Sequence, residues 1–369
     1  MCRDTKNYSD CQARNVISMF GEPIKIGIVG AGNVGRVLGV ILSVSGYSVE
    51  VVTGLNAHNI QIDNYSAYEI AGDFGNKSYL VKVIPEVDNL TDDLDMIFVC
   101  TKIFDAIPIL PKLQKKIKPN GAIVTIQNNF WIDRVVNYIN PENLVLMYLD
   151  FSCATIGKRT QVRNSDGIKL GVLRKEAFQK MEIVHDILSN VCKVKDTSDI
   201  IGLTIGRSII NTTISSLGAI SGLKLKDILL DRNGRYLFVK SIEEKVKLFK
   251  SVGIKITPYD NKLDYYMFVE NSWKGKIYRH KIIKLLIKNN GNVRSSALRD
   301  FENKRKCELI VTLDSFLKHS VLKTIDTPYT REIYSMLNEI SKGERTIYAD
   351  AFYEKRLVDI GVKNDNRRN

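Results

Sequence analysis

The sequence predicts an α/β fold in which a doubly wound, mostly parallel sheet is followed by an all-helical domain. Two observations carry this prediction. From Ile24 to about Cys192, short apolar runs alternate with helical or turn segments, as the βαβ units of a parallel sheet require. After about Asp199, apolar residues instead recur at the spacing of an α-helix, so the second half of the chain is expected to be helical.

These two patterns also predict the individual elements. Strands are expected at the apolar runs over residues 25–30, 48–52, 79–84, 96–100, 122–126, 144–150 and 168–172. A helix is expected directly after the first strand, because the apolar residues continue from Val37 to Leu42. Further helices are expected over residues 200–216, 243–252, 262–273, 299–319 and 330–340. Packing of these helices on one another and against the sheet domain is expected to leave a cleft between the two domains.

A glycine-rich turn joins the first strand to the first helix. Gly30, Gly32 and Gly35 have the GxGxxG spacing of a Rossmann-type dinucleotide site, although such spacing alone also occurs in ordinary turns. Gly30 is expected to make the tight turn, Gly32 to admit a pyrophosphate close to the backbone, and Gly35 to let the helix pack on the strand. The helix N-terminus then offers unpaired N–H groups to the phosphates. The expected cofactor-binding residues of this turn are Gly30, Ala31, Gly32, Asn33, Val34 and Gly35.

The length of 369 residues corresponds to about two domains. We expect a flexible extension over residues 1–22, a Rossmann dinucleotide-binding domain over 23–199, and an all-helical domain for substrate binding and dimerisation over 200–345. The remaining residues, 346–369, are expected to form a tail without ordered structure.

Composition excludes several classes of function. The net charge is +13, but the basic residues are spread along the chain without a nucleic-acid motif, so they predict a solvated surface that attracts anionic ligands. The six cysteines form no CxxC pair and the four histidines are scattered, which predicts reduced thiols and no metal site. No run is long enough to cross a membrane. A cytoplasmic protein without nucleic-acid or membrane partners is therefore expected.

Polar side chains follow three of the expected strands, at the edge where open α/β sheets bind ligands. Lys102 follows the strand that ends at residue 100, and Gln127 and Asn128 follow the strand that ends at residue 126. We expect all three to contribute to the cofactor site, although a loop lysine and a polar turn are the simpler alternatives. Thr53 follows the second strand, where an acidic residue would favour NAD and an arginine NADP. Thr53 and Asn56 could hydrogen-bond either cofactor.

With these residues in view, the chain resembles the ketopantoate reductase (2-dehydropantoate 2-reductase) family over residues 24–340. The resemblance rests on GAGNVG, on the lysine of VCTKIFD, on QNN at 127–129, on GRSIINTTISSLGAISG at 206–222 and on SSALRDFENKRKCEL at 295–309. It implies NADPH-dependent reduction of a small 2-keto acid, namely ketopantoate to pantoate in pantothenate biosynthesis. NADPH is the implied cofactor, with NADH as the alternative, and helical domains in such enzymes often form a homodimer contact.

The resemblance also implies roles for residues of the helical half. Ser296 would hold the substrate carboxylate and Glu308 would orient the reacting groups. Asn211 would contact the substrate, while Ser215 stands where the family has a second asparagine, four residues further on the same helix face. Asp300 and Glu308 are eight residues apart, so they are expected on nearly the same face of one helix.

Arg207 is the largest departure from the family pattern, since it stands where family members carry the lysine that polarises and protonates the ketone. Either cation can stabilise a developing oxyanion, but a guanidinium remains charged and is a poor general acid. Three hypotheses follow. Arg207 acts as a charge clamp while water, Lys102 or Glu308 delivers the proton; or the substrate is another keto acid or an imine whose second acid group Arg207 binds; or the chain is a non-catalytic nucleotide sensor.

Overall fold

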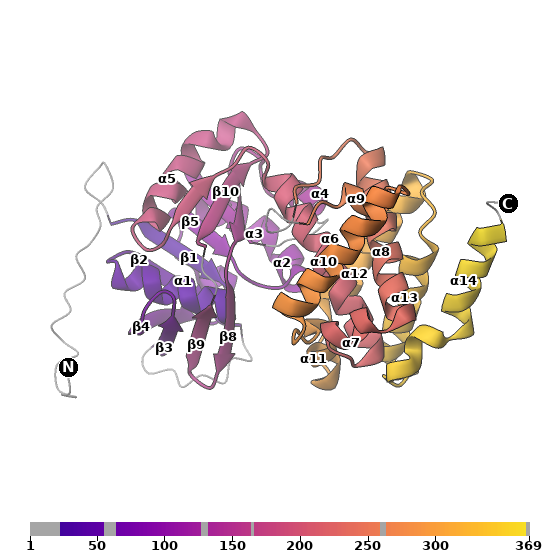
Figure 1. Cartoon of the computed structure of the whole chain (residues 1–369). Helices are drawn as coiled ribbons and strands as arrows, with labels where there is room; N and C mark the ends of the chain where they lie inside the picture. The colour runs from indigo at the N-terminus through magenta and orange to yellow at the C-terminus, as the bar shows by residue number, and fades with distance from the viewer. Residues whose placement is uncertain (1–22, 55–63, 127–131, 164–165, 259–262, 367–369) are drawn as a thin grey trace. The chain divides into compact units, whose positions relative to one another are not determined.

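The computed structural model describes residues 23–54, 64–126, 132–163, 166–258 and 263–366. The chain divides into two compact units (Figure 1). The first comprises residues 1–127 and 132–200, and the second comprises residues 128–131 and 201–369. The first holds the β-sheet and the second is helical, which confirms the predicted fold class.

The first unit is built on one sheet of eleven strands within the described residues. The strands are β1 (Lys25–Val29), β2 (Ser48–Val52), β3 (Tyr65–Gly72), β4 (Lys77–Ile84), β5 (Leu94–Val99), β6 (Ile117–Thr125), β7 (Leu144–Leu149), β8 (Ser152–Ile156), β9 (Arg159–Arg163), β10 (Ile168–Val172) and β11 (Val194–Asp196). Their order is β11-β10-β7-β6-β5-β1-β2-β4-β3-β9-β8. The six central strands, β7 to β4 in this order, pair in parallel throughout. Because the chain runs outward from β1 on one side and from β5 on the other, the topological switch point lies between these two strands.

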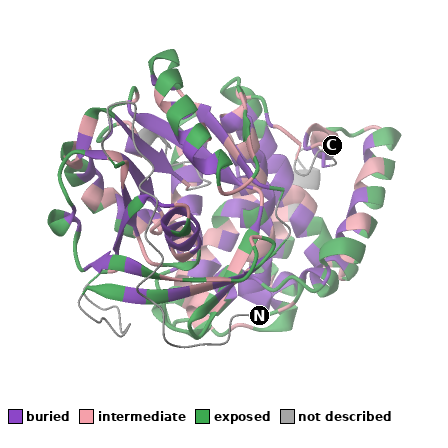
Figure 2. Cartoon of the chain, turned by 90° about the vertical axis from the view of Figure 1, so that its left-hand side faces the viewer, coloured by how far each residue is buried: buried purple, intermediate pink, exposed green. Residues whose placement is uncertain are grey.

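Helices α1 (Asn33–Val44), α2 (Ile103–Ala106), α3 (Leu110–Lys116), α4 (Ile132–Val135) and α5 (Phe178–Ser189) complete the first unit. Helix α1 contacts β2, β3 and β4 and is buried along most of its length (Figure 2). Val37, Leu38, Val40 and Ile41 have no exposed surface, so the predicted apolar helix face packs into the core of the sheet domain.

Strands β3, β8, β9 and β11 were not predicted. Strand β3 alternates between buried and exposed residues over most of its length, and β8 has no buried residue, so neither forms the continuous apolar run typical of a buried parallel strand. They form the hairpins β3–β4 and β8–β9, and the pairing of β3 with β9 joins these hairpins across a long stretch of sequence. The prediction therefore found the parallel core and missed most of the outer strands.

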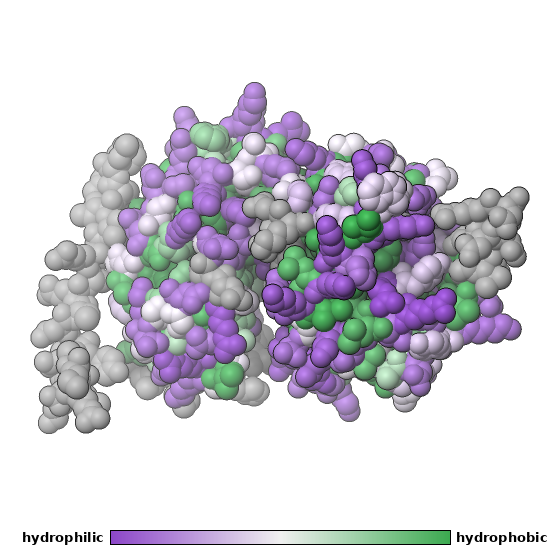
Figure 3. All heavy atoms as spheres, viewed as in Figure 1, coloured by the Kyte–Doolittle hydropathy of each residue, from purple (hydrophilic) through white to green (hydrophobic). Residues whose placement is uncertain are grey.

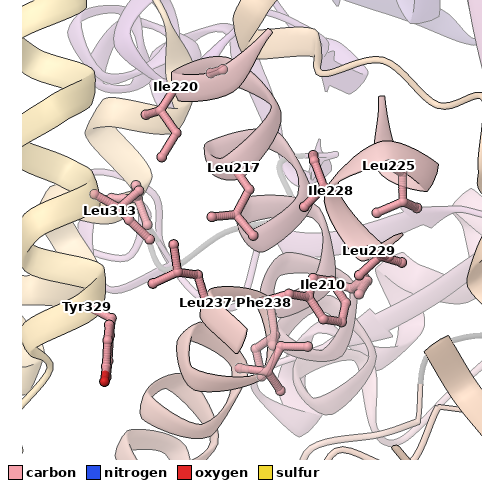
Figure 4. Packing of buried hydrophobic residues seen from close by; sticks show 14 of the residues in the cluster. Ile210, Leu217, Ile220, Leu225, Ile228, Leu229, Leu237, Phe238, Leu313 and Tyr329 are labelled. Atoms are coloured by element: carbon pink, nitrogen blue, oxygen red, sulfur yellow. The ribbon is translucent and has the colours of Figure 1, made fainter. Parts of the chain in front are cut away.

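The second unit is a bundle around one apolar core. Its helices are α6 (Ile200–Ser221), α7 (Leu225–Leu230), α8 (Arg232–Ser251), α9 (Tyr266–Val269), α10 (Trp273–Asn290), α11 (Ser296–Glu302), α12 (Glu308–Leu322), α13 (Pro328–Lys342) and α14 (Lys355–Asn366). Side chains from α6, α7, α8, α12 and α13 meet in this core, among them Leu217, Phe238 and Leu313 (Figure 4).

Three predictions for this half of the chain were wrong. The expected helix over residues 262–273 is the short helix α9, after which α10 begins at Trp273, capped by the Ser272 side chain that accepts from the Gly275 N–H. The expected helix over residues 299–319 is two helices, as described below. The segment after residue 345, expected to lack ordered structure, forms a 3-10 turn (Ala349–Tyr353) followed by α14. Phe352 is 1% exposed, so this segment closes part of the helical core.

Polar side chains cover most of the viewed face of both units, with apolar ones scattered among them (Figure 3). Within the described part of the chain, no helix is both long and apolar enough to cross a membrane.

Candidate active site

The glycine turn between β1 and α1 has the backbone geometry that its motif predicts. Gly30 has φ +109°, a conformation that side chains disfavour, and its N–H donates to the Val52 carbonyl at 3.0 Å. A Cβ on Gly35 would lie 1.9 Å from the Gly30 carbonyl oxygen, so only glycine lets α1 start this close to the turn. Both residues are therefore required by the packing of the turn itself.

Gly32 lies in a different environment. It precedes the first residue of α1, has an ordinary extended backbone, and a Cβ added there would meet no atom within 4 Å. No side chain caps the helix at this point, and no acidic residue lies in its first turn. The N-terminus of a twelve-residue helix thus faces open space with its N–H groups and its partial positive charge, which is a site for an anion. These features fit the pyrophosphate of a dinucleotide.

Lys102 lies beside this turn, at the switch point of the sheet. The Cys100 N–H donates to the Val29 carbonyl at 2.8 Å, and a Cβ on Gly30 would lie 2.8 Å from the Thr101 Cγ2. The loops after β1 and β5 are therefore in van der Waals contact. Lys102 precedes α2 and places its Nζ 5.9 Å from the centre of the Phe104 ring. The sheet thus brings Lys102 close to the glycine turn, at the edge where the sequence predicts the cofactor site.

Thr53 closes the loop after β2. Its N–H and its hydroxyl both donate to the Ile84 carbonyl, at 2.9 and 3.3 Å. Glu50, within the same strand, accepts from the Lys82 ammonium at 2.6 Å and from the Thr91 N–H at 2.9 Å. Burial raises the pKa of Glu50, but these partners outweigh it and leave the pKa below its ordinary value. Glu50 therefore has a structural role. Asn56, Gln127 and Asn128 lie outside the described residues.

In the helical unit, α6 carries three of the predicted site residues on one stripe. Asn211 is exposed, and Arg207 and Ser215, one turn before and after it, are half-buried. The residues between them on the helix are mostly buried, among them Ser208, Ile209, Ile210, Thr212 and Thr213, and so is Ser216 beyond Ser215. The buried hydroxyls donate back to carbonyls of the preceding turn, which satisfies them inside the core. The exposed stripe of this otherwise buried helix is thus polar and carries Arg207.

Gly206 explains how the helix is held next to Arg207. A Cβ at Gly206 would lie 2.2 Å from the Thr257 carbonyl oxygen, so glycine is needed where the segment that contains Thr257 passes α6. The buried Tyr265 donates its hydroxyl to the Gly206 carbonyl. Backbone contacts therefore fix the position of α6 at the residue that precedes Arg207.

Ser295 and Ser296 are neighbours that differ in burial. Ser295 is 2% exposed; its hydroxyl donates to the Ser215 carbonyl at 2.8 Å and accepts from the Leu298 N–H at 3.1 Å, so it caps α11. Ser296, the next residue, is exposed. The structure thus places the start of α11, and with it Ser296, beside the Ser215 end of the α6 stripe.

The predicted common helix face of Asp300 and Glu308 was wrong. Helix α11 ends at Glu302, and Glu308 is the first residue of α12. Between them Lys304 adopts φ +51°, and the Arg305 N–H donates to the Asp300 carbonyl at 2.8 Å. A left-handed residue ends an α-helix, so the two carboxylates belong to different helices.

Two family models match the chain. Ketopantoate reductase PanE/ApbA matches residues 26–175, and Ketopantoate reductase PanE/ApbA C terminal matches residues 199–341. The chain belongs to the ketopantoate reductase family. The resemblance drawn from the glycine turn and the two helical motifs is thereby confirmed. A search of curated proteins gives no match.

The chain matches several solved structures over nearly their whole length. The ternary structure of D-mandelate dehydrogenase with NADH and anilino(oxo)acetate has 17% sequence identity and a TM-score of 0.71, over 87% of this chain and 99% of that one. A putative 2-dehydropantoate 2-reductase from Enterococcus faecalis has 16% identity and a TM-score of 0.64, over 86% and 98%. The 2-dehydropantoate 2-reductase from Geobacter metallireducens has 17% identity and a TM-score of 0.69, over 86% and 99%. At these identities the likeness shows the shared fold.

Two side chains of α1 make contacts near the glycine turn that the sequence did not predict. The Arg36 Nε donates to the Ala31 carbonyl at 3.0 Å, and its guanidinium lies 5.1 Å from the centre of the Tyr68 ring. The side chain of Asn33, predicted as part of the cofactor site, instead bonds to strand β8. The contacts with Tyr68 and with β8 could not have been predicted, because β3 and β8 were not predicted as strands.

Proposed function

We propose that this member of the ketopantoate reductase family is an NAD(P)H-dependent reductase of a small 2-keto acid. The observation that carries the proposal is the open N-terminus of α1 at Gly32, beside Lys102 at the switch point of the sheet. Dinucleotides bind to open α/β sheets at this position. The bound nicotinamide would supply the hydride for the keto carbon.

NADPH is the cofactor we propose first, with NADH as the alternative. Family membership supports a nicotinamide cofactor, whereas Thr53 provides neither the acidic residue that selects NAD nor the arginine that selects NADP. The D-mandelate dehydrogenase of the same fold was solved with NADH, which supports testing both nucleotides.

On the substrate side, we assign the polar stripe of α6 to the keto acid. Arg207 would stabilise the negative charge that develops on the ketone oxygen, and Asn211 and Ser215 would hydrogen-bond the substrate. Ser296 would hold the carboxylate, and Glu308 would organise the hydrogen bonds. Because a guanidinium seldom releases a proton, water, Lys102 or Glu308 would deliver the proton to the alkoxide.

Ketopantoate is the first substrate to test, and an alternative follows from Arg207. A planar guanidinium binds carboxylates through two parallel hydrogen bonds, which favours a keto acid with a second acid group. The homodimer expected for this family is also a proposal, supported by a related ketopantoate reductase from Staphylococcus aureus whose structure is described as dimeric.

A substrate panel tests the proposal. NADPH and NADH oxidation would be followed with ketopantoate, an aromatic 2-keto acid and a dicarboxylic 2-keto acid. At least one pair is expected to react, and Arg207→Met is expected to lower kcat/KM by about a hundredfold through loss of oxyanion stabilisation. Arg207→Lys is expected to raise turnover of ketopantoate by restoring the family's proton donor. Nucleotide binding without oxidation by any keto acid, in the wild type and in Arg207→Lys, would instead indicate a sensor.

A further inference from the structure

Strand β8 is at one end of the sheet, and among the described residues no strand pairs with its outer edge. Its other edge pairs with β9, Cys153 opposite Val162 and Thr155 opposite Thr160. An edge strand presents a row of N–H and C=O groups that need partners. On β8 the groups in question are the carbonyl of Cys153 and the N–H of Thr155.

Both groups bond to a single side chain on α1. The Asn33 Nδ2 donates to the Cys153 carbonyl at 3.2 Å, and the Thr155 N–H donates to the Asn33 Oδ1 at 3.2 Å. The carbonyl of one residue and the N–H of the second residue after it point to the same side of a strand, so one amide can bond both. Asn33 therefore takes the place of a neighbouring strand, across 120 residues of sequence.

A second observation concerns Cys153, on β8, and Cys100, which follows β5. Burial, followed by the nearby Cys153 thiol, raises the pKa of the Cys100 thiol, and burial raises the pKa of Cys153 to about 11. Cys100 directly follows β5, two residues before Lys102, and both thiols pack against the core of the sheet domain. The side chain of Cys153 thus lies within electrostatic range of the loop that adjoins the glycine turn.

We propose that Asn33 is a positioning residue that fastens β8 to the N-terminus of α1 and thereby makes β8 one wall of the dinucleotide pocket. The inference rests on the proposed function, since it assumes that the glycine turn binds a dinucleotide. It assigns the side chain of Asn33 to β8 and leaves its backbone N–H for the pyrophosphate. The helix N-terminus binds the phosphates, and β8 restricts where the rest of the nucleotide can lie.

The test compares Asn33→Ala with Asn190→Ala in the full chain. Asn190 is a matched control, because its Nδ2 donates to the Tyr47 hydroxyl at 2.9 Å in the same unit but away from the turn. Hydrogen exchange at the Thr155 amide, measured without nucleotide, reports whether β8 is fastened. Calorimetry gives the Kd of NADPH and of NADH, steady-state kinetics gives KM and kcat, and thermal unfolding reports folding.

Asn33→Ala is expected to speed exchange at Thr155 and to raise the nucleotide Kd and KM by about tenfold, as the loss of two exposed hydrogen bonds implies, with a smaller effect on kcat. Asn190→Ala is expected to change neither Thr155 exchange nor the nucleotide Kd. The positioning role of Asn33 is overturned if hydrogen exchange at Thr155 in Asn33→Ala stays at the wild-type rate. It is also overturned if the nucleotide Kd of Asn33→Ala stays within about twofold of the wild-type Kd. If the wild-type chain binds neither nucleotide, the proposed function itself is overturned. If the wild type binds but Asn33→Ala gives either of the results above, only the role of Asn33 is overturned.

Discussion

At the residue scale, the glycine turn combines two different requirements that the GxGxxG pattern does not separate. Gly35 is required by the fold, because a Cβ there would overlap the Gly30 carbonyl. Gly32 has no steric neighbour and an ordinary backbone, so the folded chain alone does not require glycine there. The requirement at Gly32 must come from whatever occupies the open space, which is where the pyrophosphate is proposed to lie.

Alanine at each position distinguishes these two requirements. Gly35→Ala is expected to lower the free energy of unfolding by about 1–3 kcal/mol, as overpacking does. Gly32→Ala is expected to lower it by no more than about 1 kcal/mol, which is the N-cap preference for glycine over alanine without any added clash. Gly32→Ala should nevertheless weaken NADPH binding. Denaturant unfolding and calorimetry measure the two effects, and unchanged nucleotide affinity in Gly32→Ala would contradict the role of this turn.

At the scale of elements, helix α8 joins α6 and α13 through two buried charged residues. Glu244 accepts from the Tyr329 and Thr330 N–H groups at 2.9 and 2.8 Å, and so caps α13. Lys245, 1% exposed, donates from its Nζ to the hydroxyls of Thr213 and Ser241. Burial raises the pKa of Glu244 and lowers that of Lys245, so both shifts favour the uncharged forms.

The shifted pKa of Lys245 predicts a pH dependence of stability. Burial, only partly offset by Glu244, lowers the pKa of Lys245 from 10.5 to about 8. Between these values the unfolded chain holds the proton and the folded chain does not, so the free energy of unfolding rises with pH. Relative to Lys245→Met, the wild type is expected to gain roughly 3 kcal/mol across this window. The exposed Lys247→Met is the control, and parallel pH curves for the wild type and Lys245→Met would contradict the shift.

Because the backbone breaks between α11 and α12, a lysine-to-glycine substitution is expected to change the free energy of unfolding in opposite directions at Lys304 and at Lys318. Lys304 has φ +51°, so Lys304→Gly relieves strain and is expected to raise the free energy of unfolding by up to about 1 kcal/mol. Lys318 is exposed inside α12, and Lys318→Gly is expected to lower it by about 1 kcal/mol. Denaturant unfolding measures both. Equal losses at the two positions would indicate the continuous helix that the sequence pattern first predicted.

At the scale of the whole molecule, the parallel core could be predicted because its strands are continuous apolar runs. Within this core Ser48–Val52 has the predicted bounds, as does Ile168–Val172, which pairs antiparallel with β7 next to the core. The outer strands β3, β8 and β9 could not, since their residues are partly exposed and the pairing of β3 with β9 joins distant segments. The last helix, α14, was missed because its sequence is mostly polar, yet the preceding turn buries Phe352 in the helical core.

The candidate site was also predicted only in part. The position of Lys102 directly after a strand predicts that it lies at the ligand-binding edge of the sheet, and helical spacing predicts that Asn211 and Ser215 share a helix face. The structure shows both arrangements. The pairing of Asp300 with Glu308 failed because an eight-residue spacing indicates a shared face only where the helix is continuous. The charged run Asn303–Lys306 contains a backbone break that periodicity does not reveal. The roles of these residues in catalysis stay predictions.

Calorimetric titration of the full chain with NADPH and with NADH tests the central claim most directly, namely that the first unit binds a pyridine nucleotide at the N-terminus of α1. We expect binding of one nucleotide per chain, with affinity reduced in Gly32→Ala while its unfolding transition stays close to that of the wild type. Absence of heat with both nucleotides, at several temperatures and with protein shown to be folded, would contradict the claim.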